Sequence, residues 1–544
     1  MTTRSRKLLV GALAFFSLAP AMNAQNRPSA PTRPKPQRPI EVPPAVVVLQ
    51  VDATDGDSTR TIIQRDFDYG DRIQPLILDS TTMADIWRPG EKRINFAPLA
   101  QTRANFVVRA QQTLSGLHVE IFDVPKGRLR QEGYFRLPKP SANRLAAIRD
   151  SLSQLLDARA RRTFSALAAD SAARDSLAQE AKRPVALKHP GQRVAARRTA
   201  AARDSLTREL DRRDIILRAA AVRDSVRSDS VLARFAARDS IVRDSVTRER
   251  RFAIHGVSDE LERWLTGTRG IASTKIAFVE GTKLKIVDSD GANERTIPTA
   301  GAALMPSWHP SGKWIVYADA DDRGTRIAQV DLATLRPRLL SASNRGLNIT
   351  PVYTEDGKNI VWAAGGDSPA ELIIASAAGD DTVAKPFVGR TGFETLSPHF
   401  SPDGKQIVFV SPRPLTPQLF TMNVDGTGLR PLTPVVPGKR SYRTSPDWSP
   451  NGDEIAFQQQ NGDFQVWTIG AKDRVMKQLT NEGENENPSW APDGRHMSIT
   501  RRLGAIGDQK NIWVLDERTG RLRQLTSSGD ARLSDWSPAL RAAF

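Results

Sequence analysis

The chain repeats, five times in full and once in truncated form, a short phrase in which a proline, a variable residue and an aromatic residue lead into a turn that ends in glycine. The aromatic residues of its six copies follow one another at intervals of 42–48 residues, at Trp308, Tyr353, Phe400, Trp448, Trp490 and Trp536. A period of roughly 40–50 residues, with about four strands per unit, is typical of the blades of a β-propeller. The repeat therefore predicts that residues 272–544 fold as a six-bladed β-propeller.

Each copy of the phrase also predicts local structure. Most copies end in Asp-Gly or Asn-Gly, which favours a tight turn between strands because the turn needs positive φ. Proline lacks an N–H, so we expect it at the first position of a strand or in the turn. A short apolar run such as Ile407–Phe409 follows, and then in most units a second hairpin, such as Leu419–Val424 with Leu429–Thr433. The six aromatic side chains are expected to pack between neighbouring blades rather than to catalyse a reaction.

The last copy of the phrase predicts how the ring closes. The first blade begins near Lys275–Val279 and Leu284–Val287, and no hairpin follows Trp536 before Phe544. We therefore expect the final strand to complete the first blade, since closure protects the edges of the sheets.

The segments before the propeller differ in composition. Residues 1–24 join a basic start to a short apolar run and small residues, which is the pattern of a cleavable secretory signal that is too short to span a membrane. Residues 25–44 contain seven prolines and predict an extended tail. Residues 45–140 together with 251–271 predict a small N-terminal α/β domain. Its expected elements are strands at 45–51, 104–108, 117–123 and 133–137, and a helix followed by a strand within 61–78.

Residues 141–250 are predicted to form a basic helical insertion. They carry 24 Lys+Arg against 14 Asp+Glu, and thus most of the net charge of +17. Acid-to-arginine pairs four residues apart recur, as at Asp204 and Arg208, and each stabilises a helix by a few tenths of a kcal/mol. Pro184 and Pro190 must interrupt the helical pattern. We expect a pair of long α-helices, which either present a solvated charged surface or act as a binding arm.

Charge and cysteine content exclude several functions. A chain without cysteine has no disulfide, thiolate metal site, cysteine nucleophile or cysteine-linked lipid. A charge of +17 by itself suggests nucleic acid. The export signal and the concentration of charge in the insertion instead favour anionic envelope components or an acidic partner. We expect a periplasmic monomer that binds no nucleic acid, has no transmembrane helix and associates with the envelope peripherally at most.

One further segment indicates a family. Residues 255–279 begin His-Gly-Val-Ser-Asp, continue through Leu-Thr-Gly and end in Thr-Lys-Ile-Ala-Phe-Val. This segment resembles the junction of TolB proteins, in which a helix leads into the first strand of the propeller. Ser258 is expected to cap the start of that helix and Gly267 to end it. The resemblance covers residues 252–544 well and residues 45–140 weakly.

The resemblance to the TolB family implies a non-enzymatic scaffold of a Tol–Pal complex in the periplasm. Proteins of the family bind the peptidoglycan-associated lipoprotein Pal through the propeller and the inner-membrane protein TolA through the N-terminal end, and they support outer-membrane integrity and cell division. This chain departs from the family in two places. Its proline-rich start hinders strand addition to TolA, and the 141–250 insertion replaces a short connection.

A partner is expected at the propeller face around the central axis. The loops directly before the phrases carry polar residues that no core requires, so they are either partner-binding or ordinary solvent-exposed loops. Eight residues form the predicted partner-binding set, which we call the mouth set: Asn348, Thr350, Glu394, Thr395, Arg443, Thr444, Glu486 and Asn487.

No catalytic, cofactor or metal residue is predicted. The chain lacks the Gly-x-Ser-x-Gly pentapeptide of propeller-capped serine hydrolases, and it has neither His-Glu-x-x-His nor a Walker loop. Two other functions stay open at this point. One is an exported propeller enzyme, hydrolase- or lactonase-like, with calcium or another ion in its channel, and the other is a propeller that binds peptidoglycan or another carbohydrate.

Overall fold

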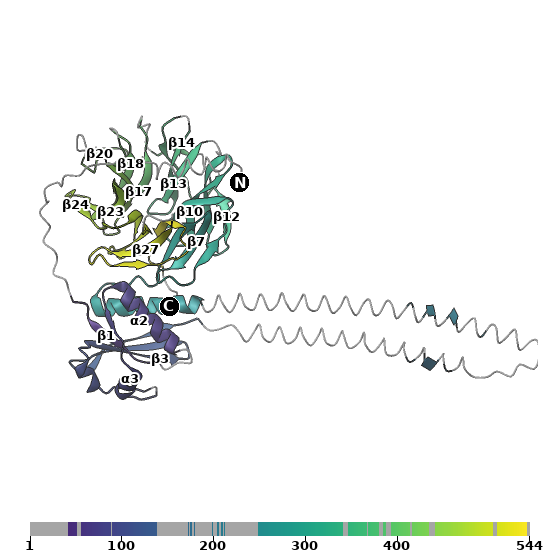
Figure 1. Ribbon diagram of the computed structural model, residues 1–544, viewed down its shortest axis with the longest axis vertical. Helices are drawn as coiled ribbons and strands as arrows, with labels where there is room; N and C mark the ends of the chain where they lie inside the picture. The colour runs from purple at the N-terminus through teal and green to yellow at the C-terminus, as the bar shows by residue number, and fades with distance from the viewer. Residues whose placement is uncertain are drawn as a thin grey trace, which may run out of the picture. The chain divides into compact units, whose positions relative to one another are not determined.

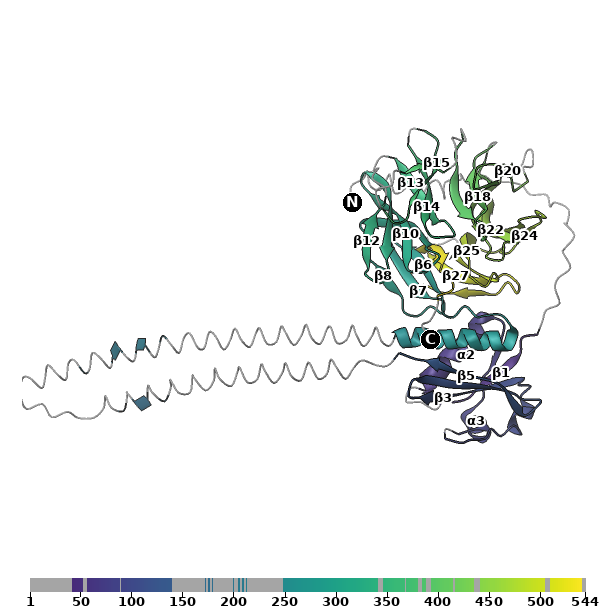
Figure 2. The same ribbon diagram turned by 180° about the vertical axis from the view of Figure 1, so that it is seen from behind.

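The structure is a computed structural model, shown from two sides in Figure 1 and Figure 2. It describes residues 42–51, 56–88, 90–138, 248–340, 346–366, 368–379, 384–387, 393–413, 416–434, 441–503 and 509–540, with isolated residues between 172 and 212. Two compact units divide the chain: Met1–Leu137 with Arg251–Phe544, and Pro138–Arg250. The first unit contains both the α/β domain and the propeller.

A five-stranded sheet organises the α/β domain (Figure 1). Its strands lie in the order β2-β1-β3-β4-β5. Strand β1 runs parallel to β2 and β3, and the other pairs are antiparallel. The strands are β1 (Ala45–Val48), β2 (Gln74–Leu76), β3 (Phe106–Thr113), β4 (Gly116–Asp123) and β5 (Arg128–Arg136).

Helices cover both faces of this sheet. Helix α2 (Gly56–Gly70) and the helix over residues 248–266 bury Phe67, Val257 and Leu261 in one hydrophobic cluster with alternate residues of the strands. Helix α3 (Ser80–Ile86) and the 3₁₀ helix Pro98–Gln101 bury Ile86 and Leu99 in a second cluster. Successive side chains of a strand point to opposite faces, so a sheet covered on both sides reads as a continuous apolar run, as β1 does.

The predicted strands and the predicted helix–strand pair of this domain are confirmed. Two details differ. Helix α3 was not predicted, although Asp79 caps it by accepting the N–H groups of Thr81 and Thr82. The expected N-cap role of Ser258 is wrong, because the helix starts earlier and the Ser258 hydroxyl donates to the carbonyl of Ile254 inside it. Gly267 does end the helix, with φ +83° and its N–H on the carbonyl of Arg263.

Six four-stranded antiparallel sheets form the propeller. The first blade contains β6 (Lys275–Glu280), β7 (Lys283–Asp288) and β8 (Arg295–Ile297), and its fourth strand is β29 (Ala531–Trp536). The second blade consists of β9 (Ala302–Trp308), β10 (Trp314–Asp321), β11 (Gly324–Asp331) and β12 (Arg336–Leu339). The third consists of β13 (Leu347–Tyr353), β14 (Asn359–Gly365), β15 (Glu371–Ser376) and β16 (Lys385–Pro386).

The remaining three blades repeat the same order of strands. The fourth consists of β17 (Leu396–Phe400), β18 (Gln406–Ser411), β19 (Gln418–Asn423) and β20 (Arg430–Pro431). The fifth consists of β21 (Tyr442–Trp448), β22 (Glu454–Asn461), β23 (Asp463–Gly470) and β24 (Met476–Gln478). The sixth consists of β25 (Glu484–Trp490), β26 (His496–Arg502), β27 (Lys510–Asp516) and β28 (Leu522–Gln524).

The ring closes as the sequence predicts. Strand β29 pairs antiparallel with β6, and the register places Ala531 opposite Glu280 and Trp536 opposite Ile276. The last strand of the chain therefore completes the first blade. The six-bladed fold is thus confirmed, and no described blade keeps an unpaired innermost strand.

The aromatic residue of each phrase lies at the contact between two blades. Trp536 is 5% exposed and packs with Ala491, Ile512 and Val514 of the sixth blade. Trp308 packs with Leu284 and Ile286 of the first blade. Tyr353, Phe400, Trp448 and Trp490 are likewise buried, each in a hydrophobic cluster. These six side chains stabilise the ring at the contacts between blades.

A β-bulge interrupts the innermost strand of every blade, three residues before the aromatic. The residue there adopts positive φ although it is not glycine, and the register of the ladder shifts at the same place. The six residues are Met305, Thr350, Ser397, Ser445, Asn487 and Leu533. The expectation that proline lies in the turn is confirmed for the second proline of the phrase, as at Pro310 and Pro402, whereas the expected place at the start of the strand is wrong for the first proline. The strand continues before the proline, since the bulge takes the proline nitrogen out of the ladder.

Most of the predicted insertion, residues 141–250, lies outside the described residues, as do the signal peptide and nearly all of the proline-rich tail. The isolated residues that are described within the insertion, such as Asp204 and Arg208, are helical. Arg208 there donates to the carbonyl of Asp204, four residues earlier.

Replacing Trp536 tests the closure. We expect Trp536→Ala to lower the free energy of unfolding by about 3–5 kcal/mol, because it leaves a cavity where the last strand meets the sixth blade. Leu339→Ala, at a residue that is 43% exposed on an outer strand, is the control and should change it by less than about 0.5 kcal/mol. Urea unfolding followed by circular dichroism measures both. Equal effects of the two substitutions would contradict closure by Trp536.

Candidate functional site

Most residues of the mouth set lie in strands and not in the loops that the sequence predicted. Asn348 and Thr350 lie in β13, Arg443 and Thr444 in β21, and Glu486 and Asn487 in β25. Only Glu394 and Thr395 precede their strand, β17. The expectation of loop residues is therefore wrong for six of the eight, because pairing with the second strand continues past the bulge, as between Glu486 and Thr500.

Five members of the mouth set are buried. Asn348 binds the carbonyl of Thr325 and accepts the indole N–H of Trp362, and Thr395 bonds to the carbonyl of Ala370. Arg443 donates to Gln418 and Gln459 at 2.7 and 2.6 Å, which joins the fourth blade to the fifth. Thr444 is buried in β21, the strand that also contains Arg443. Glu486 forms an ion pair with Lys510. Burial raises the pKa of Glu486, although Lys510 opposes this shift.

Thr350, Glu394 and Asn487 are the half-buried members of the mouth set. Thr350 and Asn487 are bulge residues, and their side chains reach the bulge of the next or the preceding blade: Thr350 accepts the N–H of Ser397, and Asn487 donates to Ser445. Burial raises the pKa of Glu394. These three side chains are the ones that a partner could contact without unfolding a blade.

The opposite ends of the innermost strands contact the α/β domain. Arg72 forms an ion pair at 3.0 Å with Asp493, which lies in the turn after β25, and Arg521 pairs with Asp68 and Asp71. A seven-residue strand spans about 20 Å. The α/β domain and the mouth set therefore occupy opposite faces of the propeller. We call them the turn face, with the turns after the phrases, and the mouth face, with the mouth set.

The contact between the α/β domain and the turn face is rich in buried charge. We call this cluster the joint and define it as Asp66, Asp71, Arg72, His255, Glu262, Asp290, Asp493 and His496. Helix α2 and the residues directly after it supply Asp66, Asp71 and Arg72. The helix over residues 248–266 supplies His255 and Glu262, and the propeller supplies Asp290, Asp493 and His496.

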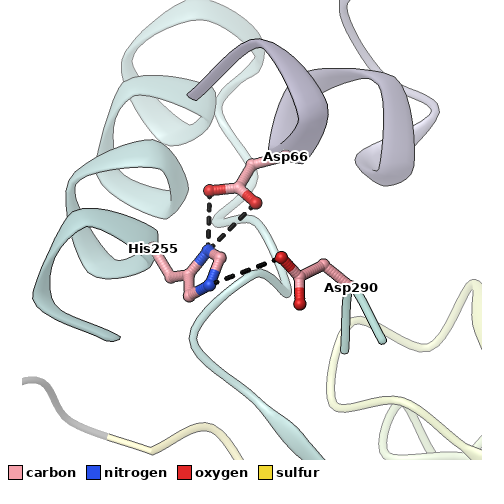
Figure 3. Close-up of side chains that lie close together, drawn as sticks. All are labelled: Asp66, His255 and Asp290. Atoms are coloured by element: carbon pink, nitrogen blue, oxygen red, sulfur yellow. Dashed lines mark hydrogen bonds and ion pairs between the residues drawn. The ribbon is translucent and has the colours of Figure 1, made fainter. Parts of the chain in front are cut away.

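His255 connects three segments of the chain (Figure 3). Its ring is fully buried, with Nδ1 2.9 Å from Oδ2 of Asp66 and Nε2 3.7 Å from Oδ2 of Asp290. Asp290 also pairs with Arg65 and Arg251. Burial by itself lowers the pKa of His255, but Asp66 and Asp290 raise it to about 9. The imidazolium is therefore the form that the joint stabilises at neutral pH.

His496 repeats this arrangement at a second place in the joint. Its Nδ1 lies 2.8 Å from Asp493 and its Nε2 lies 3.3 Å from Asp71. Burial lowers its pKa, but the two carboxylates raise it to about 9. Burial also raises the pKa of the neighbouring Glu262 to about 8, although Arg72 opposes the shift. The two histidines thus tie the α/β domain to blades one and six.

Asp259 lies in the segment that resembles TolB junctions, and it connects the helix over residues 248–266 to the propeller through hydrogen bonds to the backbone. Its buried carboxylate accepts the N–H groups of Ala272 and Ser273 at 2.6 and 3.0 Å, directly before β6. Burial raises the pKa of Asp259 to about 6. Asp259, a residue of the segment that indicated the family, therefore has a structural role: it fixes the first blade to the helix.

The acidic groups that could present ligand atoms to a cation also pair with arginine. Among the described residues, three groups could each present three ligand atoms: Asp66, His255 and Asp290; Asp71, His496 and Asp516; and His118, Glu120 and Glu132. Each includes a carboxylate already paired with arginine: Asp290 with Arg65, Asp516 with Arg495, and Glu120 with Arg109. A guanidinium that shares a carboxylate disfavours a metal cation there.

Sequence reasoning missed the joint as a charged cluster, because Asp66, Asp290 and Asp493 are far apart in the chain. One repeated signal was available and was also missed. A Leu-Thr pair directly follows the outer strand of three blades, and the hydroxyls of Thr433, Thr480 and Thr526 accept the N–H groups of Leu419, Val466 and Ile512.

Comparison with known proteins agrees with the architecture. The family model of the TolB beta propeller domain matches residues 262–540. The proteins named Tol-Pal system protein TolB from Bordetella pertussis and Bordetella bronchiseptica are each 28% identical over 301 residues, which is 54% of this chain and 66% of theirs. The crystal structure of TolB from Acinetobacter baumannii matches with a TM-score of 0.60 and 18% identity, over 92% of this chain and 98% of that one. At that identity, the structural match shows the fold.

The joint makes stability depend on pH. A histidine whose pKa rises to about 9 on folding stabilises the native state fully below its unfolded pKa of about 6.5, and this contribution disappears as the pH rises through 9. We expect the free energy of unfolding to fall between pH 6.5 and 9. His255→Gln should reduce that fall by on the order of 2 kcal/mol. Urea titrations at several pH values measure it.

The control for this prediction is His118→Gln, the same substitution in the α/β domain outside the joint, and His255→Gln should change the slope more than this control does. A slope that is the same in wild type and His255→Gln would show that His255 does not gain its proton on folding.

Proposed function

Because this chain belongs to the TolB β-propeller family, we propose that it is a periplasmic scaffold of a Tol–Pal complex. The propeller binds a Pal-type lipoprotein at the mouth face, and the N-terminal end faces a TolA-like protein of the inner membrane. In this role the protein supports outer-membrane integrity and cell division.

The observation that carries the proposal is the division of the propeller into two faces. The α/β domain contacts the turn face through the joint, as in the ion pair of Arg72 with Asp493. The mouth face keeps half-buried polar side chains at Thr350, Glu394 and Asn487, although Thr350 and Asn487 also form hydrogen bonds between blades. A rigid ring that presents such a face suits a protein partner, because pre-formed surfaces lose little entropy on binding.

The proposed location follows from the family and the amino terminus. Residues 1–24 have the pattern of a secretory signal. Within the part of the chain that is described, no helix has the length and apolar character needed to cross a bilayer. Peripheral association through Pal and TolA then suffices to hold the protein in the envelope.

The proposed role requires neither catalysis nor a cofactor. The buried acids and histidines of the joint are committed to ion pairs between domains, as with His255 and Asp66. Their perturbed pKa values therefore belong to a structural network, which is a common alternative to an active site.

Charge reversal at the mouth face tests the proposal. We expect Glu394→Lys to weaken binding of a Pal-type lipoprotein about tenfold or more, because it places a cation on a half-buried contact surface. Lys405→Glu, an exposed reversal in a turn of the turn face, is the matched control and should bind as wild type. Glu486 is unsuitable for this purpose, since its reversal would also break the buried pair with Lys510. Unchanged binding of Glu394→Lys in a pulldown with purified proteins would remove the mouth face from the proposal.

Co-purification from envelope extract tests the partners themselves. We expect the full chain to retain a Pal-type lipoprotein and a TolA-like protein. A form that lacks residues 141–250 should retain at least the Pal-type lipoprotein, because the mouth face lies in the propeller. Recovery of neither partner with the full chain would contradict the scaffold role.

A further inference from the structure

A pocket lies between the second and third blades, apart from both the joint and the mouth set. It has a volume of about 780 Å³ and is lined by the ends of strands and turns at the turn face. His309 and Trp314 contribute aromatic rings, while Arg336, Arg338 and Lys358 contribute positive charge. A pocket of this size suits a small ligand rather than a folded domain.

The aromatic wall of the pocket is uncharged. His309 accepts the N–H of Ser311 on Nδ1 at 3.0 Å, so its Nε2 carries the proton and donates to the carbonyl of Gly357 at 3.1 Å. Burial also lowers the pKa of His309. Its ring packs edge-on against Trp314 with the centroids 4.8 Å apart. The wall therefore offers apolar ring surface whose polar atoms are already bonded.

One carboxylate, that of Asp331, lines the pocket. Asp331 accepts the indole N–H of Trp314 at 3.1 Å on one oxygen and the N–H groups of Ala333 and Thr334 on the other. The lining thus carries three basic side chains against one carboxylate, so its net charge is positive.

The basic side chains are arranged for an anion. Arg338 is held against the third blade by the carbonyls of Ala377, at 2.9 Å, and Ala378, which fixes its guanidinium plane. Arg336 is exposed and makes no ion pair with any described residue. Lys358 has an 80% exposed side chain and reaches Asp356 only at 3.6 Å. One charge is thus pre-positioned, and two more can close over a ligand at little cost.

We propose that this pocket binds a carboxylate-bearing saccharide of about disaccharide size. The guanidinium and ammonium groups hold the carboxylate, since charge-assisted bonds to arginine are strong and directional. The Trp314 and His309 rings contact the apolar C–H face of a sugar ring. Strand addition by a peptide is disfavoured here, because the bordering outer strand β12 contains Pro337, which has no N–H to donate.

The proposal concerns the turn face of blades two and three and does not rest on the binding of Pal at the mouth face. Two matched probes test it on the full chain by isothermal titration: the disaccharide of N-acetylglucosamine and N-acetylmuramic acid, and N,N′-diacetylchitobiose. The first carries a carboxylate and the second is a neutral counterpart. We expect a Kd on the order of 0.1–1 mM for the charged disaccharide and binding at least about tenfold weaker for chitobiose.

Variants separate the pocket from general attraction to a basic protein. We expect Arg336→Ser and Lys358→Ser each to raise the Kd for the charged disaccharide about fivefold to tenfold, because each removes a cation that faces the pocket. Arg323→Ser is the control: it removes an exposed arginine from the turn between β10 and β11, at the mouth-face end of the same blade, and should leave the Kd unchanged. The proposal is overturned by equal binding of both sugars, by a wild-type Kd in both pocket variants, or by no binding up to about 10 mM.

Discussion

The pairing of β29 with β6 is the contact on which the rest of the structure depends. A single four-stranded blade cannot bury its own apolar faces, so each blade needs a neighbour on both sides. Closure supplies the missing neighbour between the sixth blade and the first, and it joins residues as distant as Lys275 and Ser537, which share two hydrogen bonds. Entropy opposes such a long loop only logarithmically with its length, whereas two open edges would expose a full set of backbone donors and acceptors.

Closure also explains why the repeated phrase is so regular. In each blade the same short segment forms the innermost strand, its β-bulge and the aromatic contact with the neighbouring blade. The variable residue before the aromatic adds a bond around the ring: Asp535 accepts the N–H of Trp308, Asp447 that of Trp490, and Ser489 that of Trp536. A phrase used for packing and for inter-blade bonds has little freedom left for chemistry. The variable surfaces at both faces are where function can differ between propellers.

The joint explains what the segment that resembles TolB junctions does in the folded protein. The segment that resembles TolB junctions contributes His255 and Asp259, and both side chains connect the helix to other parts of the fold rather than to solvent. Because His255 and His496 are buried against carboxylates, the docking of the α/β domain on the turn face is coupled to proton binding. The mouth face lies at the other ends of the strands, so a partner can bind there without competing with the joint.

The sequence by itself determined the number of blades, the aromatic residues that pack between them, the final strand that closes the ring and the main strands of the α/β domain. These features are local or periodic, and periodicity in turns and apolar runs is visible along a chain. Only the tertiary structure decided that six members of the mouth set lie in strands, that five of its members are buried, and that Asp66, His255 and Asp290 meet. Register at a bulge and contacts between distant segments arise from packing in three dimensions, and a pocket such as that between Trp314 and Lys358 exists only where two blades come together.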